Sequence, residues 1–149
     1  MRKYRRYDYN GLSFRSGLEL AVAKLLTEQG IEFAYETMRI PYWLKARGGM
    51  CRDCSSRHVV IKHDYTPDFY LPDTETIIEV KGLFSAKDRK KHKAIKEQLP
   101  EHNICMWFGS DRTLHRNTDT RYSKWCSDVG LPYHVGVSEV PEWLWKKTT

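Results

Sequence analysis

Apolar residues recur at helical spacing in three stretches of the chain. The first opens on Ser16, a capping serine followed three residues later by a glutamate, and stops at Gly30; one face carries Leu18, Val22, Leu25 and Leu26. The second begins at Ser85 and ends before Pro100. The third stops at Gly130 and repeats apolar positions at Tyr122, Trp125, Cys126 and Val129. This spacing predicts three amphipathic helices.

Between these helices the pattern changes to that of β-strands. Residues 31–35 alternate in character and predict a strand that continues towards the next proline. Residues 68–71 and 76–80 flank a Pro-Asp-Thr turn and predict a hairpin, and residues 104–108 form an apolar run typical of a buried strand. A short final helix is expected from Pro141. The α-β-β-β-α-β-α order predicts an α/β fold with a mixed β-sheet flanked by helices.

The length fits one domain over residues 1–149, since domains most often run to about 100–150 residues. Two segments fall outside the helix and strand patterns. Residues 1–13 form a basic arm rich in tyrosine, and residues 44–64 form a loop or insertion that contains cysteines and histidines. No apolar run approaches the ~20 residues of a membrane span, and no secretory signal is visible. We therefore expect a soluble, intracellular protein with no membrane partner.

The positive charge is concentrated in two places. The net charge is +6, and the first six residues hold four cations. A second cluster falls within residues 87–96, where Asp88 is the single acid. Its cations are Lys87, Arg89, Lys90, Lys91, Lys93 and Lys96. Such clusters suit a nucleic-acid backbone, because each neutralised phosphate releases condensed counterions. A solvated helix face is the alternative interpretation, and charge alone does not decide between the two.

The predicted hairpin brings together residues that carry chemistry. Side chains two positions apart on a strand share a face, so Glu79 and Lys81 point the same way, and Asp68 on the neighbouring strand lies beside them. Two adjacent carboxylates suit a divalent cation such as Mg²⁺. The Asp-x(10)-Glu-x-Lys spacing is that of the PD-(D/E)xK nucleases. The alternative is two unrelated surface acids and a lysine at a strand end.

Glu19 has two possible roles. As the third residue of the first predicted helix it completes a capping box with Ser16. It also lies at the edge of the apolar stripe, where nucleases of the PD-(D/E)xK class commonly place a glutamate that completes the metal site. We favour the metal role for Glu19.

Several segments, in order over about residues 14–145, resemble the phage endonuclease I family: Phe14-Arg15-Ser16-Gly17-Leu18-Glu19, Tyr65-Thr66-Pro67-Asp68-Phe69, Glu79-Val80-Lys81-Gly82-Leu83, Asp88-Arg89-Lys90-Lys91-His92 and Pro141-Glu142-Trp143. The resemblance implies a restriction-endonuclease-like core in a strand-exchanged homodimer that cuts four-way (Holliday) junctions and other branched DNA. It implies a catalytic set of Glu19, Asp68, Glu79 and Lys81. If a phage encodes the protein, the host cytoplasm is its expected location.

From this resemblance we expect phosphodiester hydrolysis with two Mg²⁺ (or Mn²⁺) ions per active site. Asp68 would bridge the ions, with Glu79 holding one and Glu19 supporting the other. Lys81 would orient the attacking water and help to deprotonate it. The DNA backbone would be positioned without sequence readout by Arg15, Lys87, Arg89, Lys90, Lys91 and Lys93.

Residues 44–64 are longer than the corresponding connection of the family and invite other hypotheses. Cys51, Cys54, His58 and His63 offer ligands that a structural Zn²⁺ accepts, although their spacing is compact. Two Cys-x-x-Cys pairs from two chains are a second arrangement, and a free dithiol in a loop is a third. Rival functions are another PD-(D/E)xK nuclease (restriction-like, mismatch-repair or transposon-end) and a non-catalytic, zinc-stapled DNA-binding module.

Overall fold

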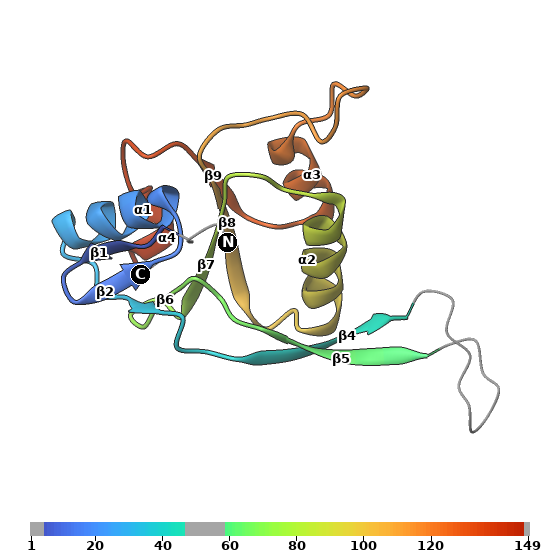
Figure 1. Ribbon diagram of the computed structural model, residues 1–149, viewed down its shortest axis with the longest axis horizontal. Helices are drawn as coiled ribbons and strands as arrows, with labels where there is room; N and C mark the ends of the chain where they lie inside the picture. Colours follow the sequence, from blue (N-terminus) through green and yellow to red (C-terminus); the bar gives the residue numbers. More distant parts are fainter. Residues whose placement is uncertain (1–4, 47–58, 148–149) are drawn as a thin grey trace.

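A computed structural model describes residues 5–46 and 59–147, and Figure 1 shows their arrangement. The helices of this part of the chain are α1 Gly17–Glu28, α2 Ala86–Gln98, α3 Tyr122–Val129 and α4 Glu142–Trp145. Its strands are β1 Tyr7–Tyr9, β2 Leu12–Phe14, β3 Ala34–Tyr35, β4 Ile40–Lys45, β5 Val60–Tyr65, β6 Phe69–Leu71, β7 Thr76–Lys81, β8 Asn103–Phe108 and β9 Tyr133–Val135. None of these helices has the length and apolar character that a membrane crossing requires.

The centre of the molecule is a five-stranded mixed sheet in the order β3-β6-β7-β8-β9. β3, β6 and β7 are antiparallel neighbours, whereas β7, β8 and β9 run parallel. β8 is buried along almost its whole length, which explains its continuous apolar sequence. The prediction of a mixed sheet flanked by helices is confirmed.

Helices cover both faces of this sheet (Figure 1). α1 and α4 pack on one face, in a core that includes Val22, Leu26 and Leu144. α2 and α3 pack on the other face through Ile95 and Cys126. Because side chains alternate along a strand, β7 contributes to both cores and its two faces are buried.

Local signals at the helix ends are confirmed. The Ser16 hydroxyl accepts a hydrogen bond from the backbone N–H of Glu19 at 3.1 Å, so it caps α1. Ser85 and Asp88 form a complete capping box at α2. Gly130 ends α3 in the left-handed conformation with φ of 83°, which glycine adopts without steric cost.

Two segments that we predicted to be irregular contain strands. Residues 7–13 of the predicted arm, together with Phe14, form the β1–β2 hairpin, which packs against α1. Residues 44–64 were predicted to be a loop, but β4 extends to Lys45 and β5 begins at Val60. The prediction failed there because five of the six β5 residues are exposed, so the strand lacks an apolar pattern and is held by backbone pairing to β4.

The chain also departs from the single strand predicted from residue 31 onwards. β3 is only two residues long, and Glu36 follows it with φ of 52°. This left-handed residue turns the chain, so that β4 leaves the central sheet and pairs with β5 as a separate ribbon (Figure 1). β9 was missed because three half-buried residues carry too little pattern.

The Gln98 side chain of α2 hydrogen-bonds the backbone of the β4–β5 ribbon. The Gln98 amide accepts a hydrogen bond from the Trp43 N–H at 2.9 Å and donates one to the Trp43 carbonyl at 2.7 Å. These two bonds replace the strand pairing that the outer edge of β4 lacks at this position. The ribbon therefore has a fixed place beside α2.

Candidate active site

The β6–β7 hairpin positions two of the expected carboxylates. Phe69 pairs with Ile78, so one further step along the register places Asp68 across from Glu79. The Asp68 carboxylate accepts a hydrogen bond from the Val80 N–H at 2.8 Å, which fixes it against β7. The predicted proximity of Asp68 to Glu79 follows directly from this pairing.

Three carboxylates gather at this end of the hairpin. Glu19, Glu36 and Asp68 each offer one oxygen, and these oxygens lie within 4.8 Å of one another. The Glu36 N–H donates to the Asp68 carbonyl at 3.0 Å, and the Glu36 carboxylate pairs with Arg15 at 2.7 Å. We did not predict Glu36, because its position depends on the left-handed turn after β3 and no sequence period marks it.

The carboxylates of this group repel one another because they carry like charges. Burial, followed by the carboxylates of Glu79 and Glu19, raises the pKa of Asp68 to about 8, against the opposing effects of the Val80 N–H and Lys81. A divalent cation would relieve this repulsion, and carboxylate oxygens are the ligands that Mg²⁺ prefers. The residues present therefore fit the expected metal.

The Glu19 carboxylate faces this acidic group. It accepts hydrogen bonds from the Ser16 hydroxyl at 3.0 Å and from the Tyr35 hydroxyl. Burial, together with the hydrogen bond to Glu19, raises the pKa of Tyr35, so this hydroxyl stays protonated and donates. Glu19 thus combines a place in the first turn of α1 with a carboxylate directed at Asp68, and helix capping does not account for all of its contacts.

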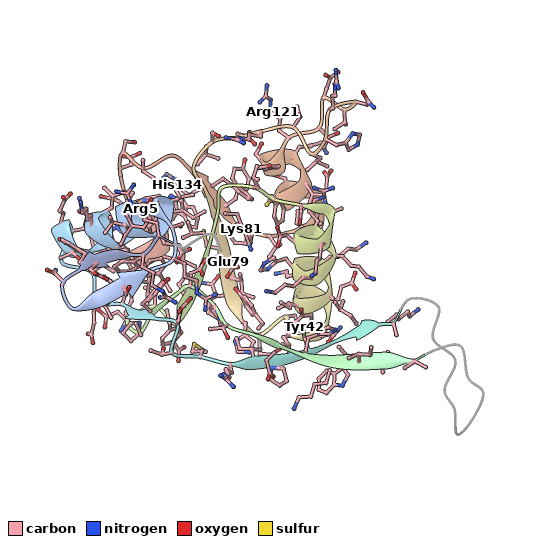
Figure 2. The ribbon with its side chains drawn as sticks, viewed as in Figure 1. Arg5, Tyr42, Glu79, Lys81, Arg121 and His134 are labelled. Atoms are coloured by element: carbon pink, nitrogen blue, oxygen red, sulfur yellow. The ribbon has the colours of Figure 1, made fainter. Side chains whose placement is uncertain are left out.

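Glu79 is held apart from that acidic group. It is 4 % exposed and accepts a hydrogen bond from the Tyr65 hydroxyl at 2.8 Å. Its other oxygen lies 3.4 Å from Lys81 Nζ and 3.8 Å from His92 Nε2. Burial of Glu79 opposes ionisation, but His92, Lys81 and Tyr65 together lower its pKa. Figure 2 shows Glu79 and Lys81 on β7, between the two helical layers.

Lys81 links β7 to the start of α2. Its ammonium lies 3.4 Å from a Glu79 oxygen and 3.3 Å from an Asp88 oxygen. Burial alone would lower the pKa of Lys81, but Glu79, Asp88 and Asp68 raise it. The lysine is therefore a cation that can donate hydrogen bonds to water or phosphate on the same strand face as Glu79.

Two further residues of the site were not predicted. Tyr65 is fully buried at the end of β5, and its ring meets the His92 ring edge-on with centroids 5.5 Å apart. His92 is 1 % exposed, and neither ring nitrogen has a hydrogen-bond partner within the described residues. His92 Nε2 lies 3.8 Å from a Glu79 oxygen, which is longer than a hydrogen bond. Both residues lie inside segments quoted for the family resemblance, which was the available signal.

Comparison with known proteins gives the family. A family model described as phage endonuclease I matches residues 1–148 of the chain. The chain belongs to the phage endonuclease I family. It is 43 % identical over 122 residues to "Endodeoxyribonuclease 1" of Enterobacteria phage T3, a match that covers 81 % of this chain and 70 % of that protein. It is 40 % identical over 122 residues to "Endonuclease I" of Escherichia phage T7, covering 81 % and 72 %.

The side chains that we predicted to contact DNA differ in exposure and in their contacts. Lys87, Lys90 and Lys93 are exposed on α2, whereas Lys91 is half-buried. Arg89 donates to the Phe84 carbonyl at 2.7 Å and so anchors the connection between β7 and α2. Arg15 pairs with Glu36 but remains 61 % exposed, which leaves it at the rim of the acidic group.

The expected zinc ligands are divided between two regions. Cys51, Cys54 and His58 lie outside the described residues, so the zinc hypothesis remains a prediction. His63 lies on β5, where it is exposed and its ring stacks on Tyr42 with centroids 5.5 Å apart.

Proposed function

We propose that the chain is a metal-dependent endodeoxyribonuclease with a PD-(D/E)xK core that resolves four-way junctions and other branched DNA. One observation carries this proposal: Asp68 lies across the hairpin from Glu79 and Lys81, with Glu19 directed at it from α1. The names of the T3 and T7 relatives support an endonuclease, and the T3 name specifies DNA as the substrate.

Glu19 and Asp68, with Glu36 beside them, would hold Mg²⁺ or Mn²⁺, and Asp68 would be shared with a second ion held by Glu79. Such ions stabilise the charge that develops on the attacking and leaving oxygens. The Tyr35 and Tyr65 hydroxyls orient the Glu19 and Glu79 carboxylates. The products would be a 5′-phosphate and a 3′-hydroxyl.

Lys81 would act on the scissile phosphate. Its raised pKa keeps the ammonium protonated, so it would donate hydrogen bonds that orient the attacking water and neutralise the phosphate. An ammonium has no lone pair, so this proposal departs from the expectation that Lys81 also helps to deprotonate the water. Asp88 on α2 holds the ammonium from its other side. In this arrangement α2 positions both the catalytic lysine and the basic residues that contact the DNA backbone.

We further propose that the active form is a homodimer, because paired incision of a junction needs two sites in one complex. The β4–β5 ribbon supports this view. It exposes large apolar side chains that a second chain would cover: Trp43 at 44 %, Val60 at 56 % and Ile61 at 48 %. Exchange of strands between the subunits would use this ribbon as the connection.

A direct test compares a four-way junction with a linear duplex that has the same arm sequences. With Mg²⁺ the protein is expected to cut the junction symmetrically on two strands and to leave the duplex largely intact. Asp68→Asn and Glu79→Gln should abolish cleavage yet bind the junction as tightly or more tightly, because each removes a negative charge near phosphate. Ca²⁺ should support binding without cleavage. Near wild-type cutting by either variant would refute the site assignment.

A further inference from the structure

A groove lies between α2 and the β4–β5 ribbon, next to the candidate active site. Its volume is about 400 Å³, and it is lined by Tyr42, Leu44, His63, Lys87, Asp88 and Lys91. Figure 2 shows Tyr42 on the ribbon beside α2. Pockets of roughly 300–1,000 Å³ suit small ligands, so this groove has room for a phosphate group with its sugar.

The groove carries an excess of positive charge. Lys87 and Lys91 are four residues apart and therefore lie on the same face of α2. Within the described part of the chain, neither lysine forms an ion pair. The single acid of the lining, Asp88, is engaged by Lys81 at 3.3 Å and by the Ser85 hydroxyl at 2.9 Å. Two ammonium groups thus face the groove without a carboxylate of their own.

Lys91 is half-buried against the protein, whereas Lys90 and Lys93 on the same helix are exposed. Its Nζ lies 4.7 Å from the centroid of the Tyr65 ring, a cation–π contact. Burial lowers the pKa of Lys91, with carboxylates including Glu79 and Asp88 opposing that effect only in part. An anion in the groove would compensate the charge of this ammonium.

The opposite wall adds hydrogen-bond donors. Tyr42 and His63 are paired across the ribbon, and their rings stack at 28°. Burial raises the pKa of Tyr42, so its hydroxyl remains protonated. A phenol and an imidazole facing two lysines make a site for phosphate oxygens.

Two contacts join the groove to the reacting groups. Tyr65, under Lys91, donates to Glu79 at 2.8 Å, and Asp88, in the lining, contacts Lys81 at 3.3 Å. An anion bound beside Lys91 would therefore lie close to the phosphate under attack, on the α2 side of Glu79.

We propose that this groove binds a second, uncleaved phosphodiester of the same DNA strand, adjacent to the scissile one, with Lys91 as its central contact and Lys87, His63 and Tyr42 around it. The proposal rests on the proposed nuclease function. The groove would fix how the strand enters the active site, and Lys91 would position the strand through a neighbouring phosphate.

The test uses a four-way junction in EDTA, so that no strand is cut, with single neutral methylphosphonates placed in turn at the phosphates flanking the cleavage position. Wild-type protein should lose about tenfold in affinity at one flanking phosphate, which corresponds to about 1.4 kcal/mol. Lys91→Met should lose a similar factor in affinity for the unmodified junction. Its affinity should not fall further when the methylphosphonate replaces that phosphate. For Lys91→Met, the magnitude of the slope of log K against log salt concentration should be smaller than that of wild type by about 0.9, because one phosphate contact is lost.

Lys90→Met provides the matched control, since its exposed side chain lies outside the groove. This variant should still lose affinity at the same methylphosphonate. Circular dichroism should show that both variants fold. If wild-type protein cuts junctions but Lys91→Met keeps the full methylphosphonate penalty at every position, the subsite is refuted and the nuclease function stands. If wild-type protein neither binds nor cuts DNA, both proposals fail.

Discussion

The Asp68 carboxylate is buried beside two other carboxylates, which makes its ionised form unfavourable. Burial, followed by Glu79 and Glu19, raises its pKa to about 8, whereas an unfolded aspartate titrates near pH 4. Between these values the folded chain binds one more proton than the unfolded chain. Its stability therefore falls as the pH rises from about 4 to about 8. Metal binding near neutral pH should accordingly release a proton.

We predict that Asp68→Asn stabilises the metal-free protein in a pH-dependent way. Asparagine can still accept the Val80 N–H but carries no charge to bury. In EDTA, the melting temperature of the variant should exceed that of wild type by a margin that is smallest near pH 4, grows up to about pH 8 and then stays constant. Thermal melts at several pH values measure this. A margin that shrinks as the pH rises would contradict the assignment.

Tyr65 is predicted to position Glu79. Removing its hydroxyl in Tyr65→Phe takes away a hydrogen bond to a buried carboxylate, a contact worth about 1.5–3 kcal/mol. We expect the cleavage rate at saturating Mg²⁺ to fall about 10- to 100-fold. The Mg²⁺ dependence of binding, measured by calorimetry, should also change.

Tyr70→Phe is a suitable control for Tyr65→Phe. Tyr70 lies on β6 and packs partly buried against the same core, but its hydroxyl has no hydrogen-bond partner within the described residues. Its loss should leave rate and metal binding near wild type. Equal effects from the two variants would assign Tyr65 a packing role only.

At the scale of elements, α2 supplies side chains to several parts of the candidate site. It supplies His92 to the core beside Glu79, Asp88 to Lys81 and the lysines of the groove. Its start is fixed by the capping box of Ser85 and Asp88. The stability of this one helix end therefore affects several parts of the site.

We predict that Ser85→Ala lowers the free energy of unfolding by about 1 kcal/mol, the usual cost of losing a side-chain N-cap. Urea denaturation should show a lower midpoint with an unchanged slope. Lys93→Ala, an exposed change on the same helix, should stay within about 0.5 kcal/mol of wild type. If Ser85→Ala matched that control, the cap would not contribute to stability.

At the scale of the whole molecule, the β4–β5 ribbon is notable for its exposed apolar side chains. Ile40, Tyr42 and Tyr65 are buried in the core beside α2. Trp43, Val60 and Ile61 on the same ribbon remain exposed. The Gln98 side chain adds two hydrogen bonds at one position of β4. In the proposed dimer, a partner subunit would cover these exposed side chains.

We predict that the protein sediments at about twice 17.6 kDa at micromolar concentration. Replacing Trp43 and Ile61 together by serine should weaken the dimer, since both expose apolar surface on the ribbon. Val137→Ser, a change of an exposed apolar residue elsewhere, is the control. A monomer that still made paired cuts in a junction would refute the dimer proposal.

Much of the candidate site follows from local sequence. Asp68, Glu79 and Lys81 belong to one hairpin, where a turn and the two-residue period of a strand determine which side chains share a face. Ser16 and Ser85 cap their helices through contacts three residues away. Interactions of such short range can be predicted, because the intervening backbone has few ways to connect the partners.

The remaining features depend on contacts between distant segments. Glu36 joins the acidic group only because a left-handed residue turns the chain and β3 pairs with β6. Tyr65 and His92 reach Glu79 from β5 and α2, and the β5 strand itself has no apolar pattern to announce it. The sequence by itself determined the candidate catalytic motif and the caps, whereas the tertiary structure decided which side chains surround that motif. The physical reason is that burial and long-range pairing, unlike strand and helix periods, are properties of the assembled core.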